Sequence, residues 1–291
     1  KNNSCLVMKK FVLGLVLSVL TFTVSAQGNF RVMFNKGDNQ YKPEGGEWTA
    51  IQTGATLADN GMVKLADNTY LGMSHSAGYT VEMKEGGEYM LADYLKEGGS
   101  SGVVKKYVDY IGQKVDDGGS RNALAATGAV ERATTTGFDV FLPSKASFFE
   151  ETAEVSWESL DGADSYTITI SDMMGTEVLK KEVGETYTTV DLKDFEGPLF
   201  LLKVKGSNGI SSTEYALTPT PPAKRSEIES EVNDLRSSLE VNSSMNALIY
   251  AEFYERNDCM VDAATYYRKA VELSPDVEYF QEMLEQFAAR N

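Results

Sequence analysis

Histidine and cysteine are almost absent from this chain. Its 291 residues include one histidine, His75, and two cysteines, Cys5 and Cys259. A zinc site needs several such ligands, so this composition argues against zinc. A Ser-His-Asp arrangement would have to use His75, but Ser74 and Ser76 share its short stretch and cannot converge on it from separate elements. We therefore expect His75 to be a surface or turn residue, and Cys259, which has no histidine to activate it, to be an inert thiol.

Basic residues are also scarce. Lysine and arginine total 27 against 43 aspartates and glutamates, and the formal net charge is −16. Such a surface repels phosphate backbones and anionic headgroups, which excludes nucleic acid as a partner. The glycine-rich stretches lack the Lys-Ser or Lys-Thr of a phosphate loop.

The acidic residues do not form a recognisable catalytic or metal-binding motif. Asp116-Asp117, and Asp161 with Asp164, lack the alternating oxygen ligands of a calcium loop. Glu150-Glu151 would specify glycoside hydrolysis only at a set separation across a cleft, which sequence does not show. We therefore assign no catalytic, cofactor-binding or metal-binding residue, and we expect that the protein is not an enzyme and needs no cofactor.

The N-terminal stretch has the pattern of a secretory signal peptide. Lys9-Lys10 precede the apolar run FVLGLVLSVLTFTV, and Val24-Ser25-Ala26 is a small-residue exit. We expect cleavage after Ala26, with residues 1–26 holding the signal peptide and the residues upstream of it. The alternative is a buried apolar helix. The mature chain would then have no transmembrane anchor and would lie in the periplasm, at the outer membrane or outside the cell, with Cys259 as its lone thiol and no disulfide.

The next region, residues 27–97, has the pattern of a small all-β domain. Short alternating runs are broken by turns such as Asp59-Asn60-Gly61. The region resembles the β domain of FecR-like periplasmic proteins. The residues that carry the resemblance are Trp48, Gly54, Leu57, Val63, Leu65, Asp67, Asn68 and Leu71. Asn68 stands where that family has glycine, which is tolerable because asparagine also enters the left-handed conformation.

Residues 98–136 are expected to form one amphipathic helix and a linker. From Ser101 to Asp117 the apolar residues recur at intervals of three and four, the period of a helix face. Gly118-Gly119 is expected to end the helix. Residues 122–136 are small and polar, which is typical of a linker.

Residues 137–220 have the clearest β pattern. Alternating residues Tyr166, Ile168 and Ile170 follow a strand that carries Trp157. The region resembles a fibronectin type III or immunoglobulin-like sandwich, on the basis of Trp157, Ala163, Tyr166 and residues 203–209. Phe200 stands at the family's corner tyrosine, so the resemblance predicts that the corner hydroxyl bond is absent.

Residues 221–291 follow a proline-marked joint and have a helical period throughout. The segment resembles about one tetratricopeptide repeat, in which small residues lie where two helices approach and large ones fill the gap. The residues at the family's spacing are Ala251, Tyr254, Ala263, Tyr267, Ala270 and Pro275. The alternative is an ordinary helical hairpin. One repeat cannot bury its own apolar face, so we expect the remainder to dock against a neighbour.

The fold class predicted from these regions is multi-domain α+β: a small all-β domain, a β-sandwich and a C-terminal α-helical hairpin bundle. Two functions are compatible with it. The first is a non-enzymatic cell-envelope scaffold or sensor, which binds protein partners through its helical tail and β domains. The second is a carbohydrate-binding or carbohydrate-active accessory protein, for which Trp48, Tyr41 and Tyr94 would have to form a flat exposed platform.

Overall fold

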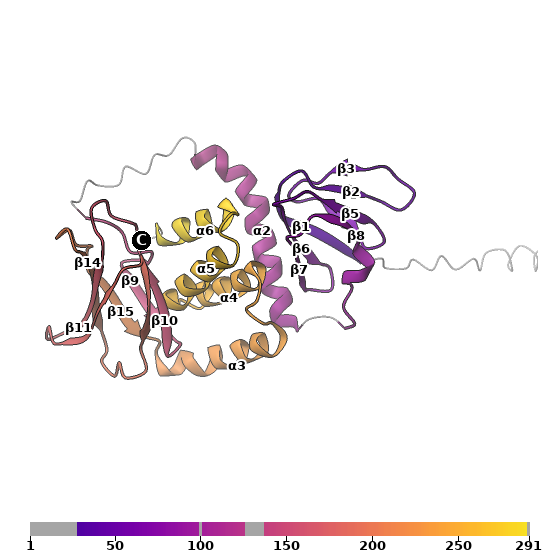
Figure 1. Cartoon of the computed structure of the whole chain (residues 1–291). Coiled ribbons are helices and arrows are strands. Elements are labelled where there is room, and N and C mark those ends of the chain that lie inside the picture. Colours follow the sequence, from indigo (N-terminus) through magenta and orange to yellow (C-terminus); the bar gives the residue numbers. More distant parts are fainter. Residues whose placement is uncertain (1–27, 99–100, 126–136, 290–291) are drawn as a thin grey trace, which may run out of the picture.

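The computed structural model describes residues 28–98, 101–125 and 137–289, and for residues 116–125 the backbone alone. The expected signal peptide, residues 1–26, lies outside them. The described chain is α+β, as predicted, with two β regions and C-terminal helices that pack together (Figure 1). None of the described helices is long and apolar enough to cross a membrane.

The N-terminal β domain consists of two four-stranded sheets. Their strand orders are β4-β1-β6-β7 and β3-β2-β5-β8. The strands are β1 (Asn29–Lys36), β2 (Gln40–Lys42), β3 (Thr49–Ala50), β4 (Thr56–Ala58), β5 (Met62–Leu65), β6 (Tyr70–His75), β7 (Thr80–Met83) and β8 (Gly87–Met90), and a short 3₁₀ helix η1 (Leu91–Tyr94) follows. Phe30, Val32 and Leu71 lie in the core of this domain. Asn68 has a φ of 54°, the left-handed conformation expected where the family has glycine.

Helix α2 (Gly102–Ala125) is longer than predicted. It begins where the Ser101 hydroxyl accepts the backbone N–H of Val104, at 3.3 Å. Gly118 and Gly119 do not end it, and the predicted linker begins inside it. A glycine within a helix costs roughly 0.5–1 kcal/mol relative to alanine, and the helix-forming residues that follow offset part of this cost.

The second β region, here called the sandwich, has a five-stranded sheet in the order β12-β11-β14-β15-β9 and a two-stranded sheet of β10 and β13. The strands are β9 (Lys145–Phe148), β10 (Thr152–Ser156), β11 (Tyr166–Asp172), β12 (Glu177–Val183), β13 (Tyr187–Asp191), β14 (Phe200–Gly206) and β15 (Tyr215–Pro219). Trp157 is 1% exposed, and its ring centroid lies 5.5 Å from that of Tyr166. Phe200 has no hydroxyl group to bond the backbone. A different residue does so here: the Tyr215 hydroxyl accepts the backbone N–H of Val140 at 3.1 Å.

Four helices complete the chain and are here called the helical unit. They are α3 (Pro222–Ser238), α4 (Ser244–Arg256), α5 (Met260–Leu273) and α6 (Glu278–Ala288). The proline-marked joint is short and packed, because Pro222 already opens α3 and the buried Thr220 hydroxyl donates to the Phe148 carbonyl at 2.9 Å.

The sandwich and the helical unit share one hydrophobic core. It runs without a break from Trp157 and Leu202 to Tyr254 and Phe287, and it includes the buried side of α2. Figure 1 shows the reason: the helical unit lies between the sandwich and α2, and the N-terminal β domain lies on the far side of α2. The predicted boundary near residue 221 therefore separates two patterns in the sequence but not two cores.

The N-terminal β domain also contacts the helical unit. The Phe34 ring lies 4.5 Å from Tyr279 and 5.4 Å from Phe280, centroid to centroid. The Lys84 ammonium donates to the Leu273 carbonyl at 2.8 Å, where α5 ends. The last helix, α6, thus packs on this chain's own N-terminal β domain.

Candidate functional site

The residues expected to pack a helical repeat lie in α4 and α5 or directly after them. Ala251, Tyr254, Ala263, Tyr267 and Ala270 are each at most 1% exposed. The exposed Pro275 follows the end of α5. The burial of the three alanines fits close packing of the helices. That the helices form a tetratricopeptide-like repeat stays a prediction.

The two tyrosines of this set also reach other parts of the chain. The Tyr254 hydroxyl donates to the Glu150 carboxylate of the sandwich. The Tyr267 hydroxyl donates to Glu255 at 2.5 Å, and its ring lies 5.1 Å from that of Phe287 in α6. The helical pair is therefore joined to its surroundings by the residues that pack it.

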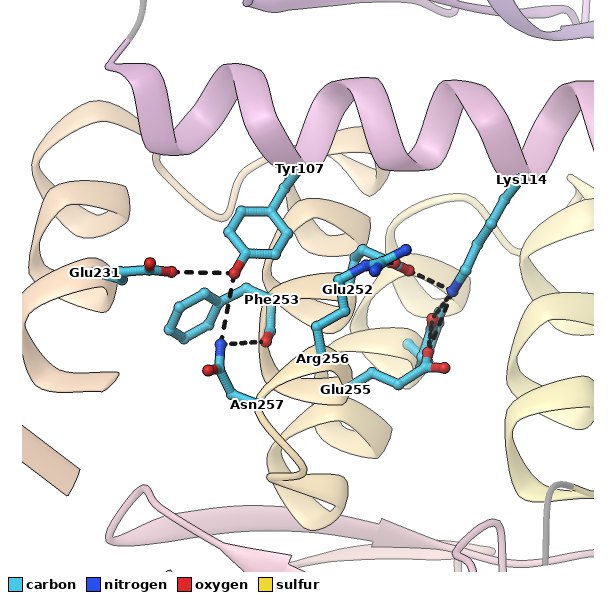
Figure 2. A network of polar contacts seen from close by, with 9 residues as sticks. Tyr107, Lys114, Glu231, Glu252, Phe253, Glu255, Arg256 and Asn257 are labelled. Atoms are coloured by element: carbon cyan, nitrogen blue, oxygen red, sulfur yellow. Dashed lines mark hydrogen bonds and ion pairs between the residues drawn. The ribbon is translucent and has the colours of Figure 1, made fainter. Parts of the chain in front are cut away.

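One polar network joins α2 to α3 and α4 (Figure 2). The Lys114 ammonium donates to Glu252, whose side chain is 2% exposed, and lies 3.4 Å from Glu255. Arg256 donates to the same Glu252 at 2.6 Å. Glu252 therefore sits between two cations, one from α2 and one from its own helix.

The second half of this network surrounds Tyr107 of α2. Its hydroxyl donates to Glu231 of α3 at 3.1 Å and accepts from Asn257 at 3.5 Å. Figure 2 shows Asn257 turned toward both Tyr107 and the Phe253 carbonyl, to which it also donates. Burial, and then the Glu231 charge, raise the pKa of Tyr107, which keeps the hydroxyl protonated as a donor.

A second polar cluster joins the sandwich to the helical unit. Asp262, in the first turn of α5, is 1% exposed and accepts the backbone N–H groups of Phe149 at 2.7 Å and Glu150 at 2.9 Å. Burial raises the pKa of Asp262 to about 7, against the effect of these two bonds, and the Glu150 charge adds to the rise. Arg236 of α3 donates to Glu150.

Aromatic rings and a small cavity border this cluster. Tyr266 stacks between Tyr250 and Tyr254, at centroid distances of 4.9 and 5.4 Å. Burial, and then the Glu150 charge, raise the pKa of Tyr254 far above its usual range. The cavity of about 270 Å³ is lined by Glu150, Thr152, Glu154, Arg236, Val241, Asp262, Thr265, Tyr266 and Lys269. Its carboxylates already have partners within the chain, as shown by Glu154 with Arg268 at 2.6 Å.

His75 is less exposed than expected. It ends β6 just before the turn to β7, and it is 9% exposed, with its ring stacked on Tyr79 at 4.6 Å. The expectation of a turn position holds, and that of a surface position is wrong, because the aromatic rings of Phe30 and Tyr79 enclose it. Burial lowers the pKa of His75, partly opposed by Asp59.

Cys259 caps the start of α5 and is fully buried. Burial raises the pKa of its thiol to about 11, so the thiolate is scarce at neutral pH, in accord with an inert thiol. The described residues contain no group of three or more histidine, cysteine, aspartate or glutamate side chains that could hold a metal ion.

The three aromatic residues of the proposed sugar platform have different surroundings. Tyr41 and Tyr94 pack against the core of the β domain, and the Tyr41 hydroxyl accepts the backbone N–H of Ala58 at 3.0 Å. Trp48 is partly exposed, with the ammonium groups of Lys42 and Lys64 at 5.8 and 6.0 Å from its ring.

Sequence reasoning missed two buried charges: Glu252, where α4 contacts α2, and Asp262, where α5 contacts the sandwich. These two contacts are here called the two joints. Glu252 interrupts the apolar run ALIYAEFYE of α4, and a charged residue within such a run is a usable signal. Asp262 had no comparable signal, because its partners are backbone groups more than a hundred positions away, in the loop after β9.

No protein-family model matches this chain, and no curated protein matches it. Among solved structures, CopC from Methylosinus trichosporium OB3b is similar over 30% of this chain and 96% of its own, at 16% identity and a TM-score of 0.23.

Proposed function

We propose that the protein is a non-enzymatic scaffold or sensor of the cell envelope, which binds protein partners through its β domains and its helical unit. The observation that carries this proposal is that the helical unit packs against α2 and against both β regions. Helices packed in this way hold the two β regions in one fixed arrangement, as a scaffold requires, while the exposed side of α3 stays accessible to a partner.

The pairing of the polar clusters supports a non-enzymatic function. A catalytic carboxylate or base must be free to exchange a proton with a substrate. Glu150, Glu154 and Asp262 line the small cavity, but each is bonded within the chain. Glu252 is held by Lys114 and Arg256, and Asp262 by backbone N–H groups. These groups are occupied in stabilising contacts between elements.

Export to the envelope, and kinship with FecR-like, fibronectin type III and tetratricopeptide-repeat proteins, belong to the same proposal. They are supported by the apolar N-terminal run, by Asn68 in the left-handed turn, and by the buried Trp157 and the α4–α5 pair.

Site-specific photo-crosslinking in intact cells tests this proposal. A photoreactive residue is placed at exposed positions of each β region, such as Thr49 and Lys193, and crosslinked proteins are identified after envelope fractionation. We expect defined envelope proteins to crosslink at particular positions. Recovery from the cytoplasmic fraction alone, or uniform crosslinking at every position, would contradict the proposal.

The carbohydrate-binding alternative now depends on Trp48 alone, since Tyr41 and Tyr94 are packed against the core. Affinity electrophoresis in gels that contain cell-wall polysaccharide would test it. Slower migration that Trp48→Ala abolishes would favour sugar binding over the scaffold function.

A further inference from the structure

A groove of about 800 Å³ crosses the outer face of the five-stranded sheet of the sandwich. It lies on the side of the sheet opposite the core, because Ile168, Ile170 and Leu202 alternate with its lining residues and are fully buried. The lining residues are Thr167, Thr169, Ser171, Asp172, Met173, Met174, Gly175, Lys180, Leu201, Lys203, Lys205, Ser211 and Glu214.

Strand register arranges these residues in rows. On β11, Thr167, Thr169 and Ser171 form a line of hydroxyl groups along the floor. Thr169 pairs with Lys180 of β12 on one side and with Lys203 of β14 on the other, and Thr167 pairs with Lys205. The hydroxyl line therefore has two lysines on the β14 side, whereas on the β12 side Lys180 stands between Glu182 and Glu177.

Two methionines form one end of the groove. Met173 is 64% exposed and Met174 is 92% exposed, the highest exposure among the large apolar side chains of the described chain. The turn that carries them is tightly held, since the Asp172 carboxylate accepts the N–H groups of Met174 and Thr176, both at 2.8 Å. These bonds lower the pKa of Asp172. The exposed methionines thus belong to an ordered turn.

The charge of the groove differs from that of the rest of the chain. Three lysines line it, whereas the whole chain has a net charge of −16. Of the two lining carboxylates, Asp172 is bonded to its own turn, and Glu214 lies 3.6 Å from Lys203. Lys180 also lies 3.4 Å from Glu177, which is outside the lining. With three lysines against two carboxylates, the lining has a small excess of positive charge, and this favours an acidic ligand with an apolar group at one end.

The spacing of the lysines indicates the form of that ligand. Lys203 and Lys205 are two positions apart on one strand, about 7 Å along its axis. An extended polypeptide presents alternate side chains on one face at this same interval. A sugar chain would gain from aromatic faces, and none of the described residues that line the groove is aromatic.

We propose that this groove binds an extended acidic segment of a protein partner. Carboxylates at alternate positions pair with Lys203 and Lys205, and an apolar side chain packs on Met173 and Met174. This proposal rests on the proposed function, for which it names one binding surface.

Fluorescence anisotropy with a defined probe tests the groove. The probe is a short labelled peptide with glutamate at alternate positions and leucine at one end, and the control probe has glutamine in place of glutamate. We expect Lys203→Glu/Lys205→Glu to weaken binding of the acidic probe by about tenfold or more, because two attractive ion pairs become repulsive. Added salt should weaken the wild-type interaction, since the pairs are exposed.

Matched variants separate the groove from the overall charge. Lys145→Glu/Lys193→Glu makes the same charge change at exposed positions of the sandwich that do not line the groove, and it should bind the probe as the wild type does. Met173→Ser/Met174→Ser should weaken binding to a similar extent at low and high salt.

Three outcomes would overturn the groove proposal: no binding of the acidic probe, equal binding of the glutamine probe, or equal loss in both charge-reversal variants. Tighter binding of a soluble polyuronate than of the peptide would instead assign the groove to acidic sugars. If the probe fails to bind while photo-crosslinked partners persist in cells, the scaffold function stands and uses another surface.

Discussion

Single residues at the two joints show how the fold tolerates buried charge. Glu252 is 2% exposed and lies between two cations, and Asp262 is 1% exposed and accepts two backbone N–H groups. Desolvation makes a buried charge costly even when it has partners, and the loss of one partner removes part of the compensation. The effects of substitution should therefore depend on which partner is lost.

Trp157 should be the largest single contributor to packing in the sandwich. It is 1% exposed and packs on Tyr166, so Trp157→Ala should lower the free energy of unfolding by about 3–5 kcal/mol through lost burial and a residual cavity. Urea denaturation followed by circular dichroism measures this cost. Trp48→Ala, at a partly exposed position, is the control and should cost less than about 1 kcal/mol. Equal costs for the two variants would show that Trp157 does not fill the core.

Asp262 should make stability fall as the pH rises. Its pKa is about 7 in the folded state and 3.8 ordinarily, so between about pH 4 and pH 7 the folded protein binds more protons than the unfolded chain does. Unfolding free energy is lost over this interval, by up to about 4 kcal/mol, and the loss is constant above it. In Asp262→Asn this part of the pH dependence should vanish. The NH₂ group of the asparagine would face a backbone N–H that the carboxylate accepts in the wild type, and this adds a loss of stability that does not depend on pH.

Chemical denaturation from pH 4 to pH 8 measures that difference, with the exposed neighbour in Glu151→Gln as the control. Parallel stability curves for the wild type and Asp262→Asn would contradict the raised pKa.

Lys114 should matter more than other lysines of α2. Lys114→Met removes a cation that contacts both Glu252 and Glu255, while Arg256 stays bonded to Glu252, so the free energy of unfolding should fall by about 1–3 kcal/mol. Lys105→Met, which breaks an exposed pair with Asp109 at 2.9 Å, should cost no more than about 0.5 kcal/mol. Thermal unfolding at a fixed pH compares the two. If the two substitutions lower the free energy of unfolding equally, the contact of Lys114 with α4 contributes no more to stability than an exposed ion pair does.

At the scale of elements, the helical unit is the connector between the other parts. Helix α4 contacts α2 through Lys114 and Tyr107, and α5 contacts the sandwich through Asp262. Helix α6 packs on Phe34 and Tyr70 of the N-terminal β domain. Outside the helical unit, these three helices thus contact three different parts of the chain.

Ala263 tests the packing of α5 at a fully buried position. It is fully buried in α5, so Ala263→Leu should overpack the contact and lower the free energy of unfolding by about 1–3 kcal/mol. Because the sandwich shares the core, strands of the sandwich should lose stability together with the helices. Ala223→Leu, at an exposed position of α3, is the control. An unchanged midpoint of urea denaturation for Ala263→Leu would contradict close packing at this alanine.

Periodicity predicted the elements well, and it failed where distant contacts decide. The alternation around Tyr166 and the helical spacing around Ala263 lie in the sequence itself, and both elements form as expected. The predicted end of α2 at Gly118-Gly119 was wrong, because two glycines weaken a helix without stopping it. The burial of His75 and the joint at Asp262 depend on residues far away in the chain, which local patterns do not report.

At the scale of the whole molecule, the sequence predicts a β domain, a sandwich and a helical bundle, whereas the described residues form two hydrophobic cores. One core spans the sandwich, α2 and the helical unit and includes Met33, Phe34 and Tyr70 of the N-terminal β domain, and a second core lies inside that domain. A shared core makes its parts depend on one another for stability. The proposed scaffold function rests on this property, because separately folded parts would move relative to one another.

Native-state hydrogen exchange at low urea concentrations, read by mass spectrometry, tests the shared core most directly. We predict that the slowest amides of α4 and α5 and those of β10, β11 and β14 exchange with the same free energy and the same dependence on urea, because one opening event exposes them all. Helical amides that exchange at a much lower free energy, while the sandwich stays protected, would show that the helical unit is a separate tail and would contradict the account.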